Sequence, residues 1–138
     1  MSVKRVVVDT NVVISALTAG GTPQKIIHAW ITGEFVAVMS TELRQEINSV
    51  FNRSKFIKLD RARRMLLGTL FNQALMVLPQ PIDEVVFSDE NDHFLLELAT
   101  TGQATFIVTG DKDLLKTKRV KGIEILNPSQ FCQKLKIK

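Results

Sequence analysis

Short apolar runs alternate along the chain with longer segments in which apolar residues recur every three or four positions. The short runs are rich in β-branched residues and end at polar or turn residues, which is typical of buried strands. Spacing of three or four residues is instead typical of helices that bury one face. We expect strands at residues 4–8, 35–39, 75–78, 105–109 and 123–126. We expect helices at residues 12–17, 23–32, 60–74, 88–100 and 128–135, and a further helix that begins at Ser40 or Thr41.

This alternation of strands and helices favours a parallel sheet with helices packed on both of its faces. No repeat, low-complexity run or linker interrupts the sequence, so we expect a single domain over residues 1–138. In sheets of this kind, functional residues lie beyond the carboxyl ends of the strands. The residues that directly follow each strand are therefore the first candidates for a functional site.

The composition is that of an ordinary globular protein, with 45% apolar and 23% charged residues. No stretch is long and apolar enough to cross a bilayer, and we expect no membrane association. The beginning of the chain does not have the pattern of a signal peptide, because Asp9 and Asn11 interrupt its apolar run. We therefore expect a soluble, cytoplasmic protein. Cys132 is the single cysteine, which excludes an internal disulfide and is typical of a small apolar residue on a helix.

The net charge of +4 is concentrated in two basic segments, at residues 53–64 and 112–121, and in a basic tail. Patches of this kind suit a polyanion such as nucleic acid. Ordinary solvated helix faces and loops have the same composition, so charge alone leaves both interpretations open.

Acidic residues follow two of the expected strands directly. Asp9 comes after the first strand, and Asp111 and Asp113 come after the fourth strand, in the sequence TGDKD. Because the carboxyl ends of parallel strands meet at one edge of a sheet, we expect these side chains to face the same crevice.

Two further acids are expected to reach the same edge from helices. In a helical projection Glu46 lies beside Leu43 and Val50 at the border of the apolar stripe, whereas Glu42 lies further toward solvent. Asp92 lies in the first turn of its helix, on the side that carries the apolar residues. From the residues alone, Glu42 remains an alternative to Glu46, and helix capping remains an alternative explanation of Asp92.

The four acids Asp9, Glu46, Asp92 and Asp111 together indicate a metal site. Carboxylates that lie close together repel one another, and burial raises their pKa values. Neither a lysine nor a histidine is among the four to neutralise them. Hard divalent cations such as Mg²⁺ and Mn²⁺ prefer oxygen ligands of this kind. The sequence therefore predicts a divalent cation at this edge of the sheet.

At these residues the sequence resembles the PIN-domain nucleases. The resemblance rests on four motifs in order, VVVDTNVVISAL, ELRQEINSVF, DENDHFLLELA and TFIVTGDKDLL, which span nearly the whole chain. The closing GIEILNPSQF resembles the end of the bacterial PIN proteins that act as toxins of toxin–antitoxin systems and are related to VapC. The resemblance implies a three-layer α/β/α sandwich with a PIN-like fold and a central parallel sheet of four to five strands. It also implies an endoribonuclease that depends on Mg²⁺ or Mn²⁺, is often a homodimer and is silenced by a small antitoxin protein.

The resemblance assigns roles to individual residues of this chain. The catalytic acids of the family fall on Asp9, Glu46, Asp92 and Asp111. Asp113 matches a further acid that holds a metal or its water, while Asn11 and Thr109 match polar positions beside the site. On this hypothesis Asp9, Asp92 and Asp111 hold one metal, and Glu46 and Asp113 complete a second site. The RNA backbone would be held by basic residues of the two basic segments, namely Arg53, Lys55, Arg61, Arg64, Lys112 and Lys116.

Two other functions fit parts of the sequence. A phosphatase with an aspartyl nucleophile, of the haloacid dehalogenase class, also places an aspartate after the first strand. In this chain, however, Asn11 stands where that class has its second aspartate, and there is little room for a cap domain. The other alternative is a non-catalytic PIN module that binds RNA or protein without cleaving it, which a degenerate acidic site would favour.

Overall fold

The computed structural model describes residues 3–18, 21–54 and 60–137, and its centre is a six-stranded sheet. The strand order is β3-β2-β1-β4-β6-β5, and every neighbouring pair is parallel except β5 and β6. The strands are β1 (Arg5–Val8), β2 (Val36–Met39), β3 (Leu75–Met76), β4 (Phe106–Val108), β5 (Arg119–Val120) and β6 (Ile123–Leu126). Five parallel strands and one short antiparallel edge strand thus confirm the expected α/β class.

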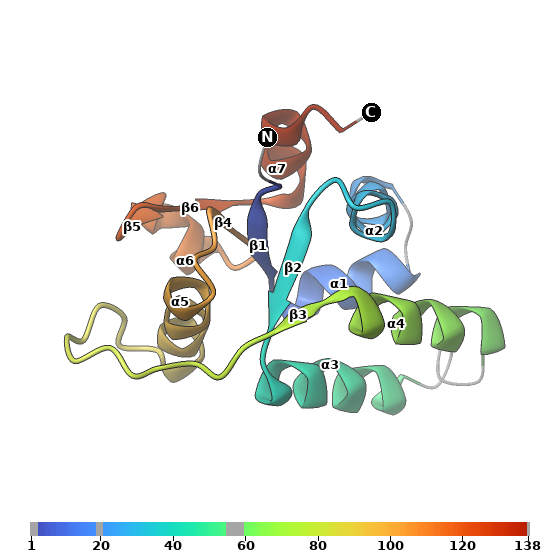
Figure 1. Ribbon diagram of the computed structural model, residues 1–138, viewed down its shortest axis with the longest axis horizontal. Coiled ribbons are helices and arrows are strands. Elements are labelled where there is room, and N and C mark those ends of the chain that lie inside the picture. The colour runs from blue at the N-terminus through green and yellow to red at the C-terminus, as the bar shows by residue number, and fades with distance from the viewer. Residues whose placement is uncertain (1–2, 19–20, 55–59, 138) are drawn as a thin grey trace.

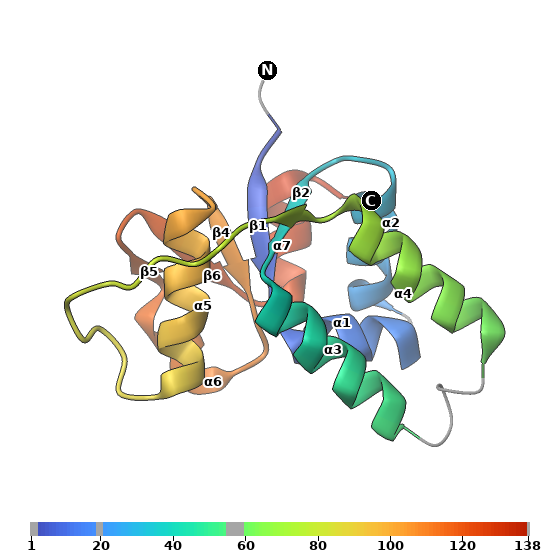
Figure 2. The same cartoon turned by 60° about the horizontal axis from the view of Figure 1, so that its bottom comes forward.

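Helices cover both faces of the sheet and make the three layers (Figure 1). The helices are α1 (Thr10–Thr18), α2 (Thr22–Ile31), α3 (Thr41–Arg53), α4 (Arg61–Gln73), α5 (Glu90–Thr101), α6 (Lys112–Thr117) and α7 (Pro128–Leu135). Figures 1 and 2 place α5 and α6 on one side of the sheet and α1, α2 and α7 on the other. Helix α3 packs on α1, and α4 packs on α2. None of the helices in the described ranges is long and apolar enough to span a membrane.

The central strands β1 and β4 are buried because helices cover them from both sides. Val6, Val7 and Val8 are almost inaccessible, as are Ile107 and Val108. A strand that is covered on both faces needs apolar side chains at successive positions rather than at alternate ones. This is why these strands appear in the sequence as continuous apolar runs.

Side-chain caps fix where the helices begin. The Ser40 hydroxyl accepts a hydrogen bond from the Leu43 N–H at 3.1 Å, and Asp60 and Asp89 cap α4 and α5 in the same way. Such caps pair backbone N–H groups that would otherwise lack partners in the first turn. Ser40 is therefore the residue that starts α3, the helix that carries Glu46.

The basic segment at residues 112–121 contains structure that the sequence pattern did not predict. Asp111 caps the short helix α6, and a tight turn with positive φ at Lys121 and Gly122 joins β5 to β6. Two residues with positive φ are characteristic of the turn that joins two antiparallel strands most closely. Helix α6 and strand β5 are too short for a period of 3.6 or 2 residues to be recognised.

Candidate active site

Asp9 lies at the junction of β1 and β4, at the carboxyl ends of both strands. Its N–H donates to the Val108 carbonyl at 2.9 Å, which extends the ladder between the two strands by one bond. Its Oδ1 accepts from the Thr10 N–H and its Oδ2 accepts from the Thr109 hydroxyl, each at 2.8 Å. The residue is 8% exposed. The carboxylate is therefore buried, and its orientation is fixed from two sides.

Thr10 connects this carboxylate to helix α3. Its hydroxyl donates to Oε2 of Glu46 at 2.8 Å, and the threonine itself is buried while Glu46 is exposed. Of the two helix acids that the sequence leaves as alternatives, Glu46 is thus the one that contacts the Asp9 region. Glu42 lies in the first turn of the same helix and is exposed.

Thr109 joins Asp9 to the loop that follows β4. The Thr109 hydroxyl accepts a hydrogen bond from the Asp111 N–H at 3.1 Å and donates its own hydrogen bond to Asp9. The side chain of Asp111 is in turn the cap of α6, since its Oδ1 accepts from the Asp113 and Leu114 N–H groups at 2.9 and 3.4 Å. A continuous series of hydrogen bonds therefore runs from Glu46 through Thr10, Asp9 and Thr109 to Asp111.

Asp92 lies on a different element from the acids above, in the first turn of α5. Its N–H donates to the capping carboxylate of Asp89 at 3.0 Å, and its own side chain is turned inward and is 7% exposed. The same side of the helix buries Leu95, Leu96 and Ala99. Asp89 is therefore the capping acid, and Asp92 needs a different explanation for its burial.

The pKa values of the two buried acids are raised. Burial is the main cause at Asp9, where the hydrogen bonds from Thr109 and Thr10 counteract it and the charges of Glu46 and Asp111 add to it. Burial also raises the pKa of Asp92, to about 6, with help from the negative charges of Asp89, Asp111, Asp9 and Asp113 in that order. Acids from β1, α5 and the loop after β4 thus act on one another across the site.

The chemistry of these residues fits a divalent cation. All of the donors are carboxylate or hydroxyl oxygens, which suit Mg²⁺ and Mn²⁺, and the charges that act most strongly on Asp92 are all negative. In the described ranges, no three acidic, histidine or cysteine side chains form a ready-made metal cage. A cation here would therefore be completed by water or by movement of the exposed Glu46 and Asp111 side chains.

The remaining residues assigned to the site lie at its border. Asp113 is exposed and forms an ion pair with Lys116 at 3.5 Å, so its charge is directed toward solvent. Asn11 is exposed on α1. Its neighbour Thr10, which no motif or strand-end rule singles out, makes the contacts with the acids. A signal for Thr10 was present, since a threonine directly after a strand-end aspartate can donate from both its N–H and its hydroxyl.

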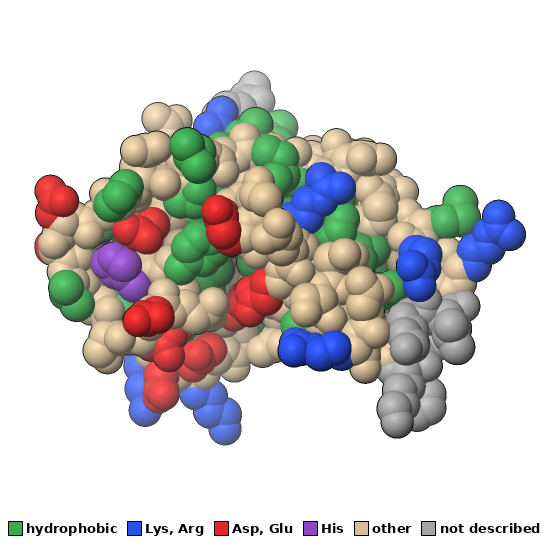
Figure 3. All heavy atoms as spheres, turned by 90° about the horizontal axis from the view of Figure 1, so that it is seen from below, with side chains coloured by type: hydrophobic (Ala, Val, Ile, Leu, Met, Phe, Trp, Pro, Cys, Tyr) green, Lys and Arg blue, Asp and Glu red, His purple; other side chains and the backbone are tan. Residues whose placement is uncertain are grey.

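Basic side chains lie on the same face as the acids, the face at which β1 and β4 end (Figure 3). Figure 3 shows acidic side chains spread over the left half of this face, from its edge to the centre, with basic side chains below them and to the right. Lys112 is exposed directly after Asp111, while the exposed Arg53 and Arg61 lie at the far ends of α3 and α4. Arg64 lies over the ring of Phe51, with 6.0 Å between its guanidinium carbon and the ring centroid. Lys55 lies outside the described residues.

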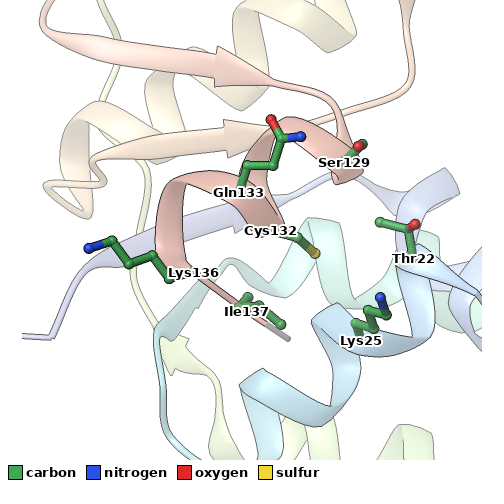
Figure 4. Close-up of a pocket in the computed structure, with 7 residues that line it drawn as sticks. All are labelled: Thr22, Lys25, Ser129, Cys132, Gln133, Lys136 and Ile137. Carbon is green, nitrogen blue, oxygen red and sulfur yellow. The ribbon is translucent and has the colours of Figure 1, made fainter.

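A pocket between α2 and α7, of about 360 Å³, contains Cys132 and lies apart from the acids (Figure 4). Its lining consists of Thr22, Lys25, Ser129, Cys132, Gln133, Lys136 and Ile137. Cys132 is 7% exposed, and burial raises the pKa of its thiol. The cysteine therefore packs as a small apolar residue, as the sequence predicted, and its thiol is held in the protonated form.

Comparisons with known proteins place the fold and the family. Residues 5–113 match the model of the PIN domain. Uncharacterized protein MJ1680 from Methanocaldococcus jannaschii is 32% identical over 117 residues, which are 83% of this chain and 75% of that protein.

Two solved structures have the same fold. One is VapBC2 from Rickettsia felis, determined bound to a DNA fragment from its promoter, with a TM-score of 0.62 and 14% identity over 89% of this chain and 98% of that chain. The other is PAE2754 from Pyrobaculum aerophilum, with a TM-score of 0.57 and 18% identity over 100% of both chains. At these identities the likeness shows the fold alone. The residues matched by the PIN model include all of the acids described above, and the chain therefore belongs to the PIN domain family, a family of nucleases.

Proposed function

We propose that this PIN-domain protein is a metal-dependent ribonuclease that hydrolyses phosphodiester bonds of RNA. The observation that carries the proposal is the pair of buried carboxyl groups, Asp9 and Asp92, which reach one site from β1 and α5 and repel each other there. Burying two like charges costs free energy, and the positive charge of a bound divalent cation would offset this cost. Membership of a nuclease family supports the same conclusion.

Asp9, Asp92 and Asp111 would hold a first Mg²⁺ or Mn²⁺, and Glu46 and Asp113 would complete a second site. When bound, such a cation lowers the pKa of a water ligand and neutralises charge that develops on the phosphoryl group. The chain supplies the orientation of the ligands. Thr10 and Thr109 donate to the acids from fixed positions, so the carboxylates are arranged before substrate arrives.

Glu46 is the residue best placed to accept a proton during hydrolysis, because it is exposed at the border of the site while Asp9 and Asp92 are buried. In the reaction the water oxygen bonds to phosphorus and one ester bond between phosphorus and oxygen breaks. Glu46 takes one proton of the water, and the other stays on the new phosphate group. The departing oxygen takes a proton from solvent water and becomes a hydroxyl group. The two products are one RNA end that carries a phosphate and one that carries a hydroxyl.

Lys112 and Lys116 would hold the RNA backbone close to the acids, with Arg53, Lys55, Arg61 and Arg64 extending the basic surface. The ion pair between Lys116 and Asp113 is highly exposed on both sides. Exposed pairs of this kind contribute little free energy, so a phosphate can displace Asp113 at small cost.

Cleavage of a labelled RNA by the purified protein, with and without Mn²⁺, tests this proposal. We expect Mn²⁺-dependent cleavage that is lost in Asp9→Asn, while the circular dichroism spectrum of the variant stays that of the wild type. Full activity of Asp9→Asn would contradict the scheme. RNA binding by the wild type without any metal-dependent cleavage would instead identify a non-catalytic module. A beryllofluoride adduct on Asp9 would identify the aspartyl phosphatase.

We further propose that the protein is the toxin of a toxin–antitoxin pair and acts in the cytoplasm as a homodimer. The closing GIEILNPSQF and the fold shared with VapBC2 support this assignment. Induced expression should stop growth, Asp9→Asn should not, and co-expression of a small antitoxin from a neighbouring reading frame should restore growth. Light scattering of the purified protein tests the dimer. Normal growth during expression of the active protein would refute the toxin assignment and leave the nuclease assignment intact.

A further inference from the structure

Thr10 is bonded to two acids that come from different elements of the fold. Its N–H donates to Oδ1 of Asp9 at the end of β1, and its hydroxyl donates to Oε2 of Glu46 on α3, both at 2.8 Å. The residue is 3% exposed, so its own N–H and hydroxyl groups have little access to water. One residue thus fixes the relative positions of two carboxylates that are far apart in the sequence.

Glu46 needs such a partner more than the other acids of the site do. It is exposed on a helix, where a free glutamate side chain samples many rotamers, and its charge interacts unfavourably with that of Asp9. Both effects favour conformations in which the carboxylate points away from Asp9. The Thr10 hydroxyl opposes both, because a hydrogen bond to a charged acceptor is among the stronger ones in proteins.

We propose that Thr10 is a positioning residue, whose buried hydroxyl holds the Glu46 carboxylate beside Asp9 for binding of a divalent cation. The role of the cation rests on the proposed function. The contact between Thr10 and Glu46 does not depend on it. The hydroxyl can donate only one hydrogen bond, and it donates this bond to Glu46. The Glu46 carboxylate is therefore held as the acceptor.

The proposal predicts different results for substitutions that keep or remove the hydroxyl. Thr10→Val has nearly the same shape without the donor, and Thr10→Ser keeps the donor without the methyl group. Mn²⁺ binding, measured by calorimetry in the absence of RNA, should weaken on the order of tenfold in T10V and stay within about twofold of wild type in T10S. Glu46→Asp, whose shorter side chain withdraws the carboxylate from Thr10, should weaken binding to a similar degree. Adding T10V to E46D should weaken it little further.

A double-mutant cycle on the metal-free protein tests the contact independently. We expect T10V and Glu46→Ala to be coupled in urea unfolding, by roughly fivefold in the unfolding equilibrium constant. Glu42, one turn earlier on α3, is the matched control, and T10V with Glu42→Ala should be additive. Additive T10V and E46A, or unchanged Mn²⁺ affinity in T10V, would overturn the proposal. If the wild type binds no Mn²⁺, the metal site of the proposed function fails and the positioning role fails with it, while coupling in the cycle would still establish the contact.

Discussion

The Thr109 hydroxyl donates to Oδ2 of Asp9 across the boundary between β4 and β1, although the two residues are 100 positions apart in the sequence. Both residues are buried, and they extend strands that are paired in parallel register from Val6 and Phe106 onward. The pairing of β1 with β4 therefore determines which side chains face each other beyond the strand ends. Its register places a hydroxyl donor on one strand opposite a carboxylate on the next.

Replacing Thr109 with valine should both destabilise the protein and change its pH dependence. The variant loses the bond to Asp9 and leaves the Asp111 N–H without its acceptor, which should lower the free energy of unfolding by about 2 kcal/mol. The Thr109 bond lowers the pKa of Asp9, so its loss raises that pKa further. If cleavage requires ionised Asp9, the acidic limb of the pH–rate profile should move to higher pH.

Thr109→Ser is the control for this prediction, because it retains the hydroxyl. It should restore both the pH–rate profile and most of the stability. A valine variant that is destabilised but has an unchanged acidic limb would show that Thr109 contributes to folding without acting on Asp9.

The raised pKa of Asp92 makes the metal-free protein less stable at neutral pH than it would be with a neutral side chain. The folded state holds the proton up to a pH of about 6, above the ordinary value of 3.8, so it binds protons more tightly than the unfolded state. This contribution to stability is present below pH 4 and is lost as the pH rises through 6. Asp92→Asn should therefore increase the free energy of unfolding at pH 7.5 in EDTA, on the order of 2 kcal/mol.

Urea unfolding at pH 4 and pH 7.5 measures this effect. The advantage of the variant over wild type should be small at pH 4, and added Mn²⁺ should stabilise the wild type more than the variant. Asp113→Asn is the matched control, since that acid is exposed and its replacement should have little effect at either pH. An Asp92→Asn protein that is less stable than wild type at pH 7.5 would contradict the conclusion that burying the ionised Asp92 carboxylate destabilises the folded protein.

Gly102 allows the end of α5 to pack closely against β2. A β-carbon at this position would lie 2.4 Å from Cγ1 of Val38, although the backbone conformation itself would accept alanine. Gly102→Ala should therefore lower the free energy of unfolding by about 1–3 kcal/mol through overpacking. Gly68, within α4, has open space around it, and Gly68→Ala should stabilise the protein by about 0.5–1 kcal/mol. Thermal unfolding of both variants checks the opposite signs.

Lys112 should contribute to RNA binding as a phosphate contact. In an Asp9→Asn background that does not cleave, Lys112→Gln should weaken binding of single-stranded RNA and reduce the salt dependence of log K by about 0.7. Lys134 on α7 is the control, because that helix lies on the opposite face of the sheet from α6 (Figure 1). Equal effects of Lys112→Gln and Lys134→Gln would indicate diffuse attraction to the net charge instead of contacts near the acids.

The sequence predicted the placement of the candidate acids best where a single structural rule determines it. Asp9 and Asp111 follow strands, and the rule for parallel sheets places them at one edge. Asp92 follows from the phase of its helix, and its burial confirms the inward orientation. For Glu46 the phase indicated the border of the apolar stripe, and the contact with Thr10 distinguishes it from Glu42.

What the sequence did not predict depends on contacts between distant parts of the chain. Thr10 acquires its role from the packing of α1 on α3, which no local pattern encodes. The sequence pattern of residues 112–121 indicates little beyond their charge. In the structure Arg119 and Lys121 pair with Glu124 and Glu84, so part of that charge supports the sheet edge.

The central place of β1, between β2 and β4, also determines when the site can exist. A nascent chain exposes Asp9 early, but its partners Thr109 and Asp111 are synthesised about a hundred residues later. Until β4 has left the ribosome and closed this long loop, Asp9 lacks both its hydroxyl donor Thr109 and the neighbouring acid Asp111. For the ribonuclease proposed above, activity begins only after translation of the region that contains β4.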